Sequence, residues 1–337
     1  MYQTDRKNAT NSFSIRTDLA IEARELAQQE AKQADHLEGV AVKTEENPDY
    51  FLTHVEIHSE KGSQLMGKPM GNYITLEAEK LKENDAECHE KIIKVLAENI
   101  RSLAQFDEES CILVAGLGNW NITPDALGPK VVSKILVTRH LQGTLPEEIE
   151  ETVRPVAAVS PGVMGITGIE TGEIIKGIVE RLHPSLLIAI DALAARRSNR
   201  INAAIQLSDT GISPGAGVGN KRMMLDQESL GIPVIAIGVP TVVDAATLVN
   251  DTMDRILGEM MQQTEKGSAF FQTLQSLEQE EKYQMIADIL GPYTGNMFVT
   301  PKEVDAVVDR LANIIANSIN IAIHPGVTMD DINKYTF

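Results

Sequence analysis

The chain has 337 residues, of which 48 are acidic and 30 basic, so its formal net charge is −18. A surface this acidic repels phosphate backbones, and we therefore expect no direct binding to nucleic acid. The length allows one large or two modest domains. Residues 1–14 lack the apolar run of a signal peptide, and no segment resembles a transmembrane span in length. These features predict a soluble, cytoplasmic protein with no membrane partner.

The N-terminal third is expected to hold a polar arm, two helices and a small antiparallel β element. Residues 1–18 are rich in Asn, Ser and Thr and predict a mobile arm. Helical patterns cover 19–35 and 84–105. Apolar and polar residues alternate at 52–57 and 73–77, which predicts two paired strands.

From residue 111 onward, short apolar runs alternate with helical patterns. We expect strands at 111–116, 155–159, 186–190, 203–207 and 233–238, and helices at 126–141, 171–182 and 241–262. This alternation is typical of an α/β fold with a mostly parallel sheet and helices on both faces.

The C-terminal part has two further features. Thr300, followed three residues later by Glu303, predicts a capping box at the start of a last helix. Residues 263–285 are rich in Gln and Glu and predict a peripheral helical insertion.

Two aspartates stand out because each follows an apolar strand. Asp125 comes soon after the strand 112–116, and Asp191 directly follows 186–190. The carboxyl ends of parallel strands meet at one edge of a sheet, where two carboxylates can share a proton and activate water. Each also has a structural reading. Asp125 would cap the next helix, and Asp191 would be a buried acid held by backbone amides.

Other chemistries find little support in the sequence. The turn 116–118 begins like a dinucleotide fingerprint, but Asn121 stands where the third glycine belongs. No Gly-x-Ser-x-Gly motif occurs, and the seven histidines show no metal-ligand spacing. We expect no metal and no cofactor. The alternative to water activation by the two aspartates is a nucleotide-type binding enzyme, which would be non-proteolytic, on a similar α/β fold.

Basic residues lie near the second aspartate in the sequence and at the end of a glycine-rich loop. Arg196 and Arg197 follow Asp191, and Lys221 and Arg222 end the loop. In so acidic a chain, these four residues are candidates for holding an acidic substrate side chain. Otherwise they are ordinary solvated surface.

Several long motifs have the order and spacing of one known family. They lie at 116–119, 123–129, 161–170, 189–196, 215–222, 231–238 and 240–244. Over residues 14–335, the chain resembles the germination (spore) proteases of endospore-forming bacteria. Through Gly-x-Gly-Asn and the two aspartates, it is more distantly similar to hydrogenase maturation endopeptidases. It departs from some germination proteases in a shorter region at 256–285 and in Ser213, where some carry His.

The resemblance implies an endopeptidase that initiates the degradation of small acid-soluble spore proteins during germination. It implies a homotetramer in the forespore and spore core, made as a self-processing zymogen. The family's two catalytic aspartates correspond to Asp125 and Asp191.

The N-terminal arm carries a segment that resembles the family's substrate consensus. This segment is Thr-Asp-Leu-Ala-Ile-Glu at 17–22. We therefore predict self-cleavage between Asp18 and Leu19, with 1–18 as propeptide and 19–337 as a single peptidase domain. The simpler reading is that Asp18 only caps the helix that follows.

Overall fold

The computed structural model describes residues 17–30, 37–104, 107, 110–214, 223–263 and 297–335. The chain divides into two compact units. One contains 17–243 and 298–337, and the other contains 1–16 and 244–297. The second unit contains helix α9 (Ala245–Gln263). The expected insertion 263–285 lies outside the described residues, except for residue 263, which ends α9.

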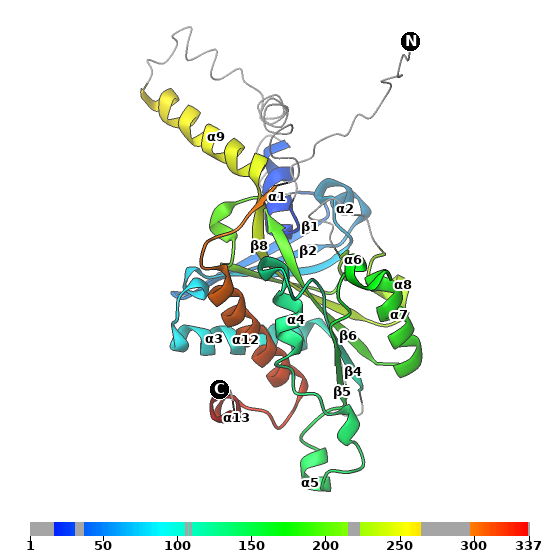
Figure 1. Ribbon diagram of the computed structural model, residues 1–337. Helices are drawn as coiled ribbons and strands as arrows, with labels where there is room; N and C mark the ends of the chain where they lie inside the picture. The colour runs from blue at the N-terminus through cyan, green and yellow to red at the C-terminus, as the bar shows by residue number, and fades with distance from the viewer. Residues whose placement is uncertain are drawn as a thin grey trace, which may run out of the picture. The chain divides into compact units, whose positions relative to one another are not determined.

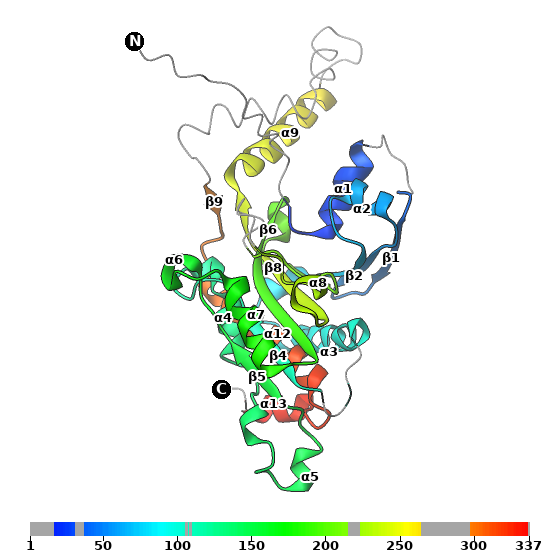
Figure 2. The same ribbon diagram turned by 90° about the vertical axis from the view of Figure 1, so that its right-hand side faces the viewer.

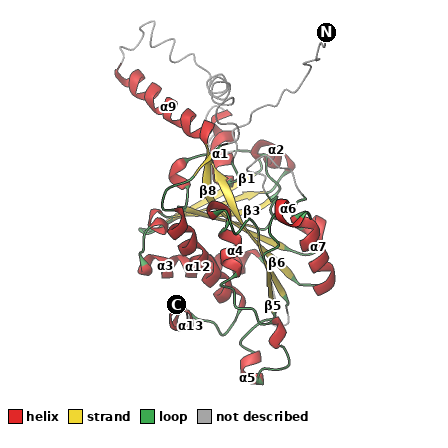
Figure 3. Ribbon diagram, in the orientation of Figure 1, coloured by secondary structure: helices red, strands yellow, loops and turns green. Residues whose placement is uncertain are grey.

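The strands form one mixed sheet, drawn in yellow in Figure 3. Their order across the sheet is β1 (Val40–Glu46), β2 (Phe51–Ile57), β3 (Gly71–Glu77), β7 (Ala204–Ser208), β8 (Val234–Asp244), β6 (Leu186–Ala195), β4 (Ile112–Gly116) and β5 (Val156–Val159). A ninth strand, β9 (Phe298–Val299), pairs with β8. The pairs from β8 through β6 and β4 to β5 are parallel. Those from β8 through β7, β3 and β2 to β1 are antiparallel.

The expectation of a mostly parallel sheet therefore holds for only one half. Strand β7 runs antiparallel to β8, because the connection from β6, residues 196–203, is shorter than the dozen or so residues of a parallel crossover. The small antiparallel β element is likewise no separate unit, since β3 pairs with β7 and joins it to the main sheet. Strand β1 was not predicted, because only its first residue is buried and its sequence shows no alternation.

Helices cover both faces of the parallel half, as expected (Figure 1). Along β4, Ile112 and Val114 pack on one face, and Leu113 and Ala115 on the other, as the two-residue repeat of a strand requires. The first face holds α3 (Ala86–Leu103), α4 (Leu127–Val132) and α12 (Val304–Ile323), and the second holds α7 (Thr171–Leu182) and α8 (Gln227–Leu230).

The remaining helices are short. Figure 2 shows α1 (Ala20–Glu30) and α2 (Glu60–Met66) beside β1 and β2, where they close a small apolar cluster. The others are α5 (Glu147–Glu150), α6 (Met164–Thr167) and α13 (Met329–Tyr335). Among the described residues, α12 is the one helix long and apolar enough to cross a membrane, and most of it is buried against its neighbours as a core helix.

Several predicted helix ends are wrong. The helix expected over 126–141 ends at Val132, because the chain beyond it bonds elsewhere: Leu136 N–H donates to the side-chain oxygen of Asn320. Strand β8 continues through the β-branched residues 241–243, so α9 begins only at Ala245. No capping box forms before α12, since Thr300 Oγ1 donates instead to the carbonyl of Thr241 (2.8 Å). The prediction for 171–182 is confirmed by α7.

Candidate active site

Asp191 lies inside strand β6 and not at its end. The strand continues to Ala195 by pairing with β8, with a shift of register between Leu193 and Ala194. The Asp191 residue is 6% exposed, and its Oδ1 accepts the N–H of Ala192 at 2.9 Å. A buried acid in an apolar strand costs stability unless it is paired, and such sites are enriched in function.

Asp125 ends the 3-10 turn Thr123–Asp125, just before α4. Its Oδ2 accepts the N–H of Asn119 at 2.8 Å. Gly118 makes this approach possible: its φ is +110°, and a Cβ there would lie 2.0 Å from the carbonyl oxygen of Asp125. Thr241 Oγ1 fixes the turn to β8 by donating to the Pro124 carbonyl at 2.7 Å. The Gly-Leu-Gly-Asn motif therefore positions Asp125.

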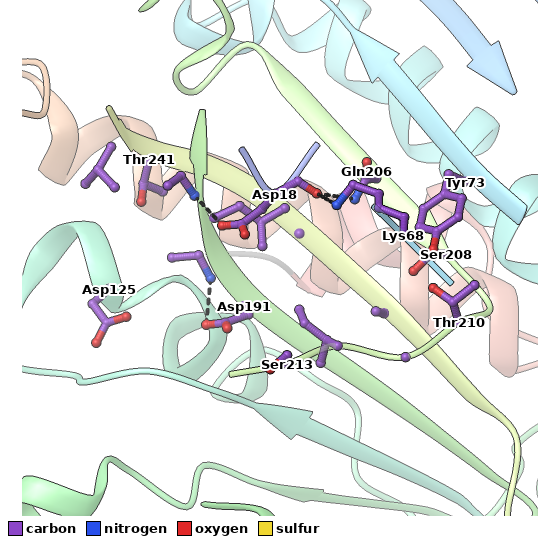
Figure 4. A pocket seen from close by; sticks show the side chains of 18 of the residues that line it. Asp18, Lys68, Tyr73, Asp125, Asp191, Gln206, Ser208, Thr210, Ser213 and Thr241 are labelled. Atoms are coloured by element: carbon purple, nitrogen blue, oxygen red, sulfur yellow. Dashed lines mark hydrogen bonds between the residues drawn. The ribbon is translucent and has the colours of Figure 1, made fainter. Parts of the chain in front are cut away.

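The two aspartates line one cavity of about 550 Å³. Figure 4 shows the carboxyl groups of Asp125 and Asp191 at the same end of this cavity, carried by different elements. Asp18, from the predicted cleavage segment, lines the same cavity. The fold thus brings together three acidic residues that the sequence analysis singled out.

Asp18 is attached to strand β6 by two hydrogen bonds with Ala194. Its N–H donates to the Ala194 carbonyl at 3.2 Å, and its Oδ2 accepts the Ala194 N–H at 2.9 Å. Burial raises the pKa of the Asp18 carboxyl, and the Ala194 hydrogen bond opposes that shift. Asp18 was expected to cap the next helix, but its Oδ2 accepts the N–H of Ala194. Thr17 Oγ1 accepts the N–H of Leu19 at 3.1 Å.

The carbonyl oxygen of Asp18 accepts two side-chain hydrogen bonds. Lys68 Nζ donates at 2.8 Å and Gln206 Nε2 at 3.4 Å. Sequence reasoning missed both residues. They lie 50 and 188 positions from Asp18, and neither belongs to a motif with a recognisable spacing.

The residues after Asp18 are also fixed by packing and hydrogen bonds. Leu19 is fully buried and packs with Ile21, Leu193 and Ile212. The carboxylate of Glu22 accepts the main-chain N–H groups of Arg196 (2.7 Å) and Arg197 (2.9 Å), and it faces the guanidinium of Arg200 at 3.3 Å.

The four basic residues singled out in the sequence take different places. Arg196 and Arg197 do bind a carboxylate, that of Glu22, but they do so through their main-chain N–H groups. The Arg197 side chain instead pairs with Glu25 at 3.0 Å. Lys221 and Arg222 lie outside the described residues.

Arg200 was missed. It is 6% exposed and pairs with three glutamates, which are Glu22, Glu25 and Glu77. A signal existed in the string of arginines at 196, 197 and 200, but the acids that bind Arg200 come from distant parts of the chain. Within the described part of the chain, no group of three or more His, Cys, Asp or Glu side chains is arranged to hold a metal ion.

Comparison with known proteins decides the family. Residues 20–275 and 258–336 match the family described as germination protease. The chain belongs to the germination protease family. It is 51% identical to a germination protease of Clostridium tetani, over 96% of this chain and 99% of that one. It is 45% identical to one of Bacillus cereus, over 97% and 98% of the two chains.

Among solved structures, the [NiFe] hydrogenase maturation protease HycI from Thermococcus kodakarensis matches with a TM-score of 0.32 and 17% identity, over 66% of this chain and 98% of that one. Membership of the germination protease family confirms the resemblance seen in the motifs and makes the protein an endopeptidase. The alternative of a nucleotide-type binding enzyme has no support from these relatives.

Proposed function

We propose that this endopeptidase initiates the degradation of small acid-soluble spore proteins during germination and uses Asp125 and Asp191 to activate water. We further propose that it is made as a zymogen, with 1–18 as propeptide and 19–337 as the peptidase domain, and acts as a homotetramer in the forespore and spore core. One observation carries the proposal: Asp18, which precedes the proposed cleavage site, lines the same cavity as both aspartates.

The reaction needs one aspartate in each protonation state. The ionised carboxylate takes a proton from water, whose oxygen attacks the carbonyl carbon of Asp18. The protonated carboxyl then gives its proton to the nitrogen of Leu19 as the C–N bond breaks. We assign the roles of acid and base to the pair and not to one residue, because carboxyl groups that share a site can share one proton.

The same contacts support a zymogen. The segment 17–22 fills the positions that a substrate's residues need: Leu19 occupies an apolar pocket, and the amides of Arg196 and Arg197 hold Glu22. A spore protein with the same pattern of residues must displace this segment before it binds. The uncleaved arm is therefore both the first substrate and an inhibitor.

The proposal is tested by incubating the purified full-length chain at mildly acidic pH and determining the new N-terminus. We expect it to be Leu19. Asp125→Asn and Asp191→Asn should each abolish the cut while leaving the thermal unfolding temperature near that of the unsubstituted protein. The control is Asp330→Asn, which replaces an exposed residue of α13 and should cleave normally. Cleavage by folded Asp125→Asn and Asp191→Asn proteins would refute the aspartate pair.

A further inference from the structure

Two side chains hold the carbonyl oxygen of the residue before the proposed cut. Lys68 Nζ and Gln206 Nε2 donate to the Asp18 oxygen at 2.8 and 3.4 Å. In Figure 4 these two residues lie on one side of Asp18, and Asp191 and Asp125 lie on the other. The carbonyl therefore directs its oxygen toward the two donors, away from the side on which a water activated by the aspartates would attack.

Both donors are fixed by their own surroundings. Lys68 follows Gly67, which ends helix α2 with a φ of +61°. Its main chain is tied back to Ser63, whose Oγ donates to the Lys68 carbonyl at 2.7 Å. Gln206 lies in β7, and its Oε1 accepts the N–H of Ala20 at 2.6 Å. Because that bond requires the oxygen, the amide nitrogen of Gln206 must face Asp18.

We propose that Lys68 and Gln206 are catalytic residues that bind the carbonyl oxygen before the cut and stabilise the negative charge it acquires. The inference rests on the proposed cleavage of the Asp18–Leu19 bond. When water attacks, a C–O bond forms, the water's proton goes to the ionised aspartate, and the carbonyl π electrons move to the oxygen. When the C–N bond breaks, that electron pair re-forms the carbonyl and Leu19 N takes the other aspartate's proton. Lys68 and Gln206 exchange no proton in either step.

The surroundings of Lys68 suit this role. Burial lowers the pKa of its ammonium, and the nearby charges of Asp18 and Glu22 oppose that shift. Lys68 is half-buried, and a partly desolvated cation interacts more strongly with a developing oxyanion than a fully solvated one does. Pre-placed donors of this kind need no reorganisation at the moment of reaction, and losing one typically slows catalysis about 10²–10³-fold.

The test measures the first-order rate constant of self-cleavage of the full-length chain by mass spectrometry. Lys68→Met, which keeps an unbranched side chain out to Cε but has no donor, should slow cleavage about 10²–10³-fold. Lys68→Arg, which keeps a charged donor, should recover most of the rate. Gln206→Glu keeps the acceptor for Ala20 but turns an anionic oxygen toward the Asp18 carbonyl, so it should slow cleavage about tenfold or more. The control is Lys61→Met, since Lys61 is an exposed residue of α2 paired only with Glu38 among the described residues.

The outcomes separate this inference from the proposed function. A Lys68→Met protein that cleaves within threefold of the unsubstituted chain overturns the role of Lys68, while Asp191→Asn remains inactive and the aspartate pair stands. If Lys68→Arg is as slow as Lys68→Met although both are folded, the lysine is not acting as a charged donor, and the inference is overturned. Should Lys68→Met fail to fold, the rates of Lys68→Arg and Gln206→Glu test the inference. A slow Lys68→Arg protein or a Gln206→Glu protein of normal rate would overturn it. Cleavage by folded Asp191→Asn would instead refute the proposed function.

Discussion

Asp18 and Ala194 are joined by two hydrogen bonds, one from each main-chain nitrogen. Ala194 lies three residues beyond Asp191 in β6, just after the register between β6 and β8 shifts. The strand that carries one proposed catalytic aspartate therefore also positions the residue before the proposed cut. Irregular points in a sheet are common next to active sites, because they redirect the chain locally.

Docking of the N-terminal segment should strengthen on acidification. The pKa of docked Asp18 lies above its usual 3.8, so the docked form binds a proton more tightly than the undocked form. Docking is then favoured below the raised pKa and is weakened as pH rises through it. In an Asp191→Asn background, which cannot cut the bond, the exchange protection of the Ala194 amide should increase as pH is lowered toward that pKa.

The control for this pH effect is Asp18→Asn in the same Asp191→Asn background. The amide still accepts the Ala194 N–H but does not titrate, so the protection factor of that N–H should become independent of pH. An unchanged pH dependence would show that another group controls docking.

Glu22 should anchor the segment through its charge. Its buried carboxylate accepts two main-chain N–H groups and pairs with Arg200. In Glu22→Gln the NH₂ group would face one of those N–H groups, and leaving a buried donor unsatisfied costs about 1–3 kcal/mol. We expect self-cleavage to slow about tenfold. The matched control is Glu38→Gln, an exposed residue paired with Lys61, and equal rates for the two variants would contradict an anchoring role.

The catalytic candidates were predictable because each leaves a local trace. Asp191 interrupts a strand that is otherwise apolar, and Asp125 follows glycines that a close approach requires. Lys68 and Gln206 leave no such trace, because their role arises only when the loop after α2 and the strand β7 meet Asp18. A role for Glu22 could be predicted only from its place in the segment 17–22, which resembles the substrate consensus.

The same distinction applies to the fold. Strands β4, β6 and β8 are apolar throughout the parts that were predicted, because both faces are covered by the core. The direction of β7 was not predictable, since an apolar run reads the same in a parallel and an antiparallel strand. The end of β6 was missed for a different reason: residues after Asp191 pair with the extension of β8, which is a long-range contact.

Gly118→Ala should disable Asp125. The added Cβ would lie 2.0 Å from the Asp125 carbonyl oxygen at a φ of +110°, which L side chains rarely adopt. Strain and overpacking of this kind cost about 1–3 kcal/mol each, and the turn that carries Asp125 must shift to relieve them. We expect self-cleavage to fall by more than about 10²-fold and the unfolding temperature to drop. Gly165→Ala, in α6 with no atom near the new Cβ, should cleave normally. A normal rate for Gly118→Ala would mean that Asp125 tolerates displacement.

His324 should make the fold acid-sensitive. The residue is fully buried at the end of α12, where Nδ1 accepts the N–H of Arg154 (3.1 Å) and Nε2 donates to the Leu136 carbonyl (3.2 Å). Burial lowers the pKa of His324 to about 4, so the unfolded chain takes up the proton first. The stabilisation is complete above a pH of about 6.5 and is lost as pH falls toward 4, by at most about 3 kcal/mol.

The free energy of unfolding from urea titrations should fall over this window in the unsubstituted protein. It should fall less steeply in His324→Gln and equally steeply in His58→Gln, which replaces an exposed histidine. Parallel curves for all three proteins would rule out His324 as the source of the slope.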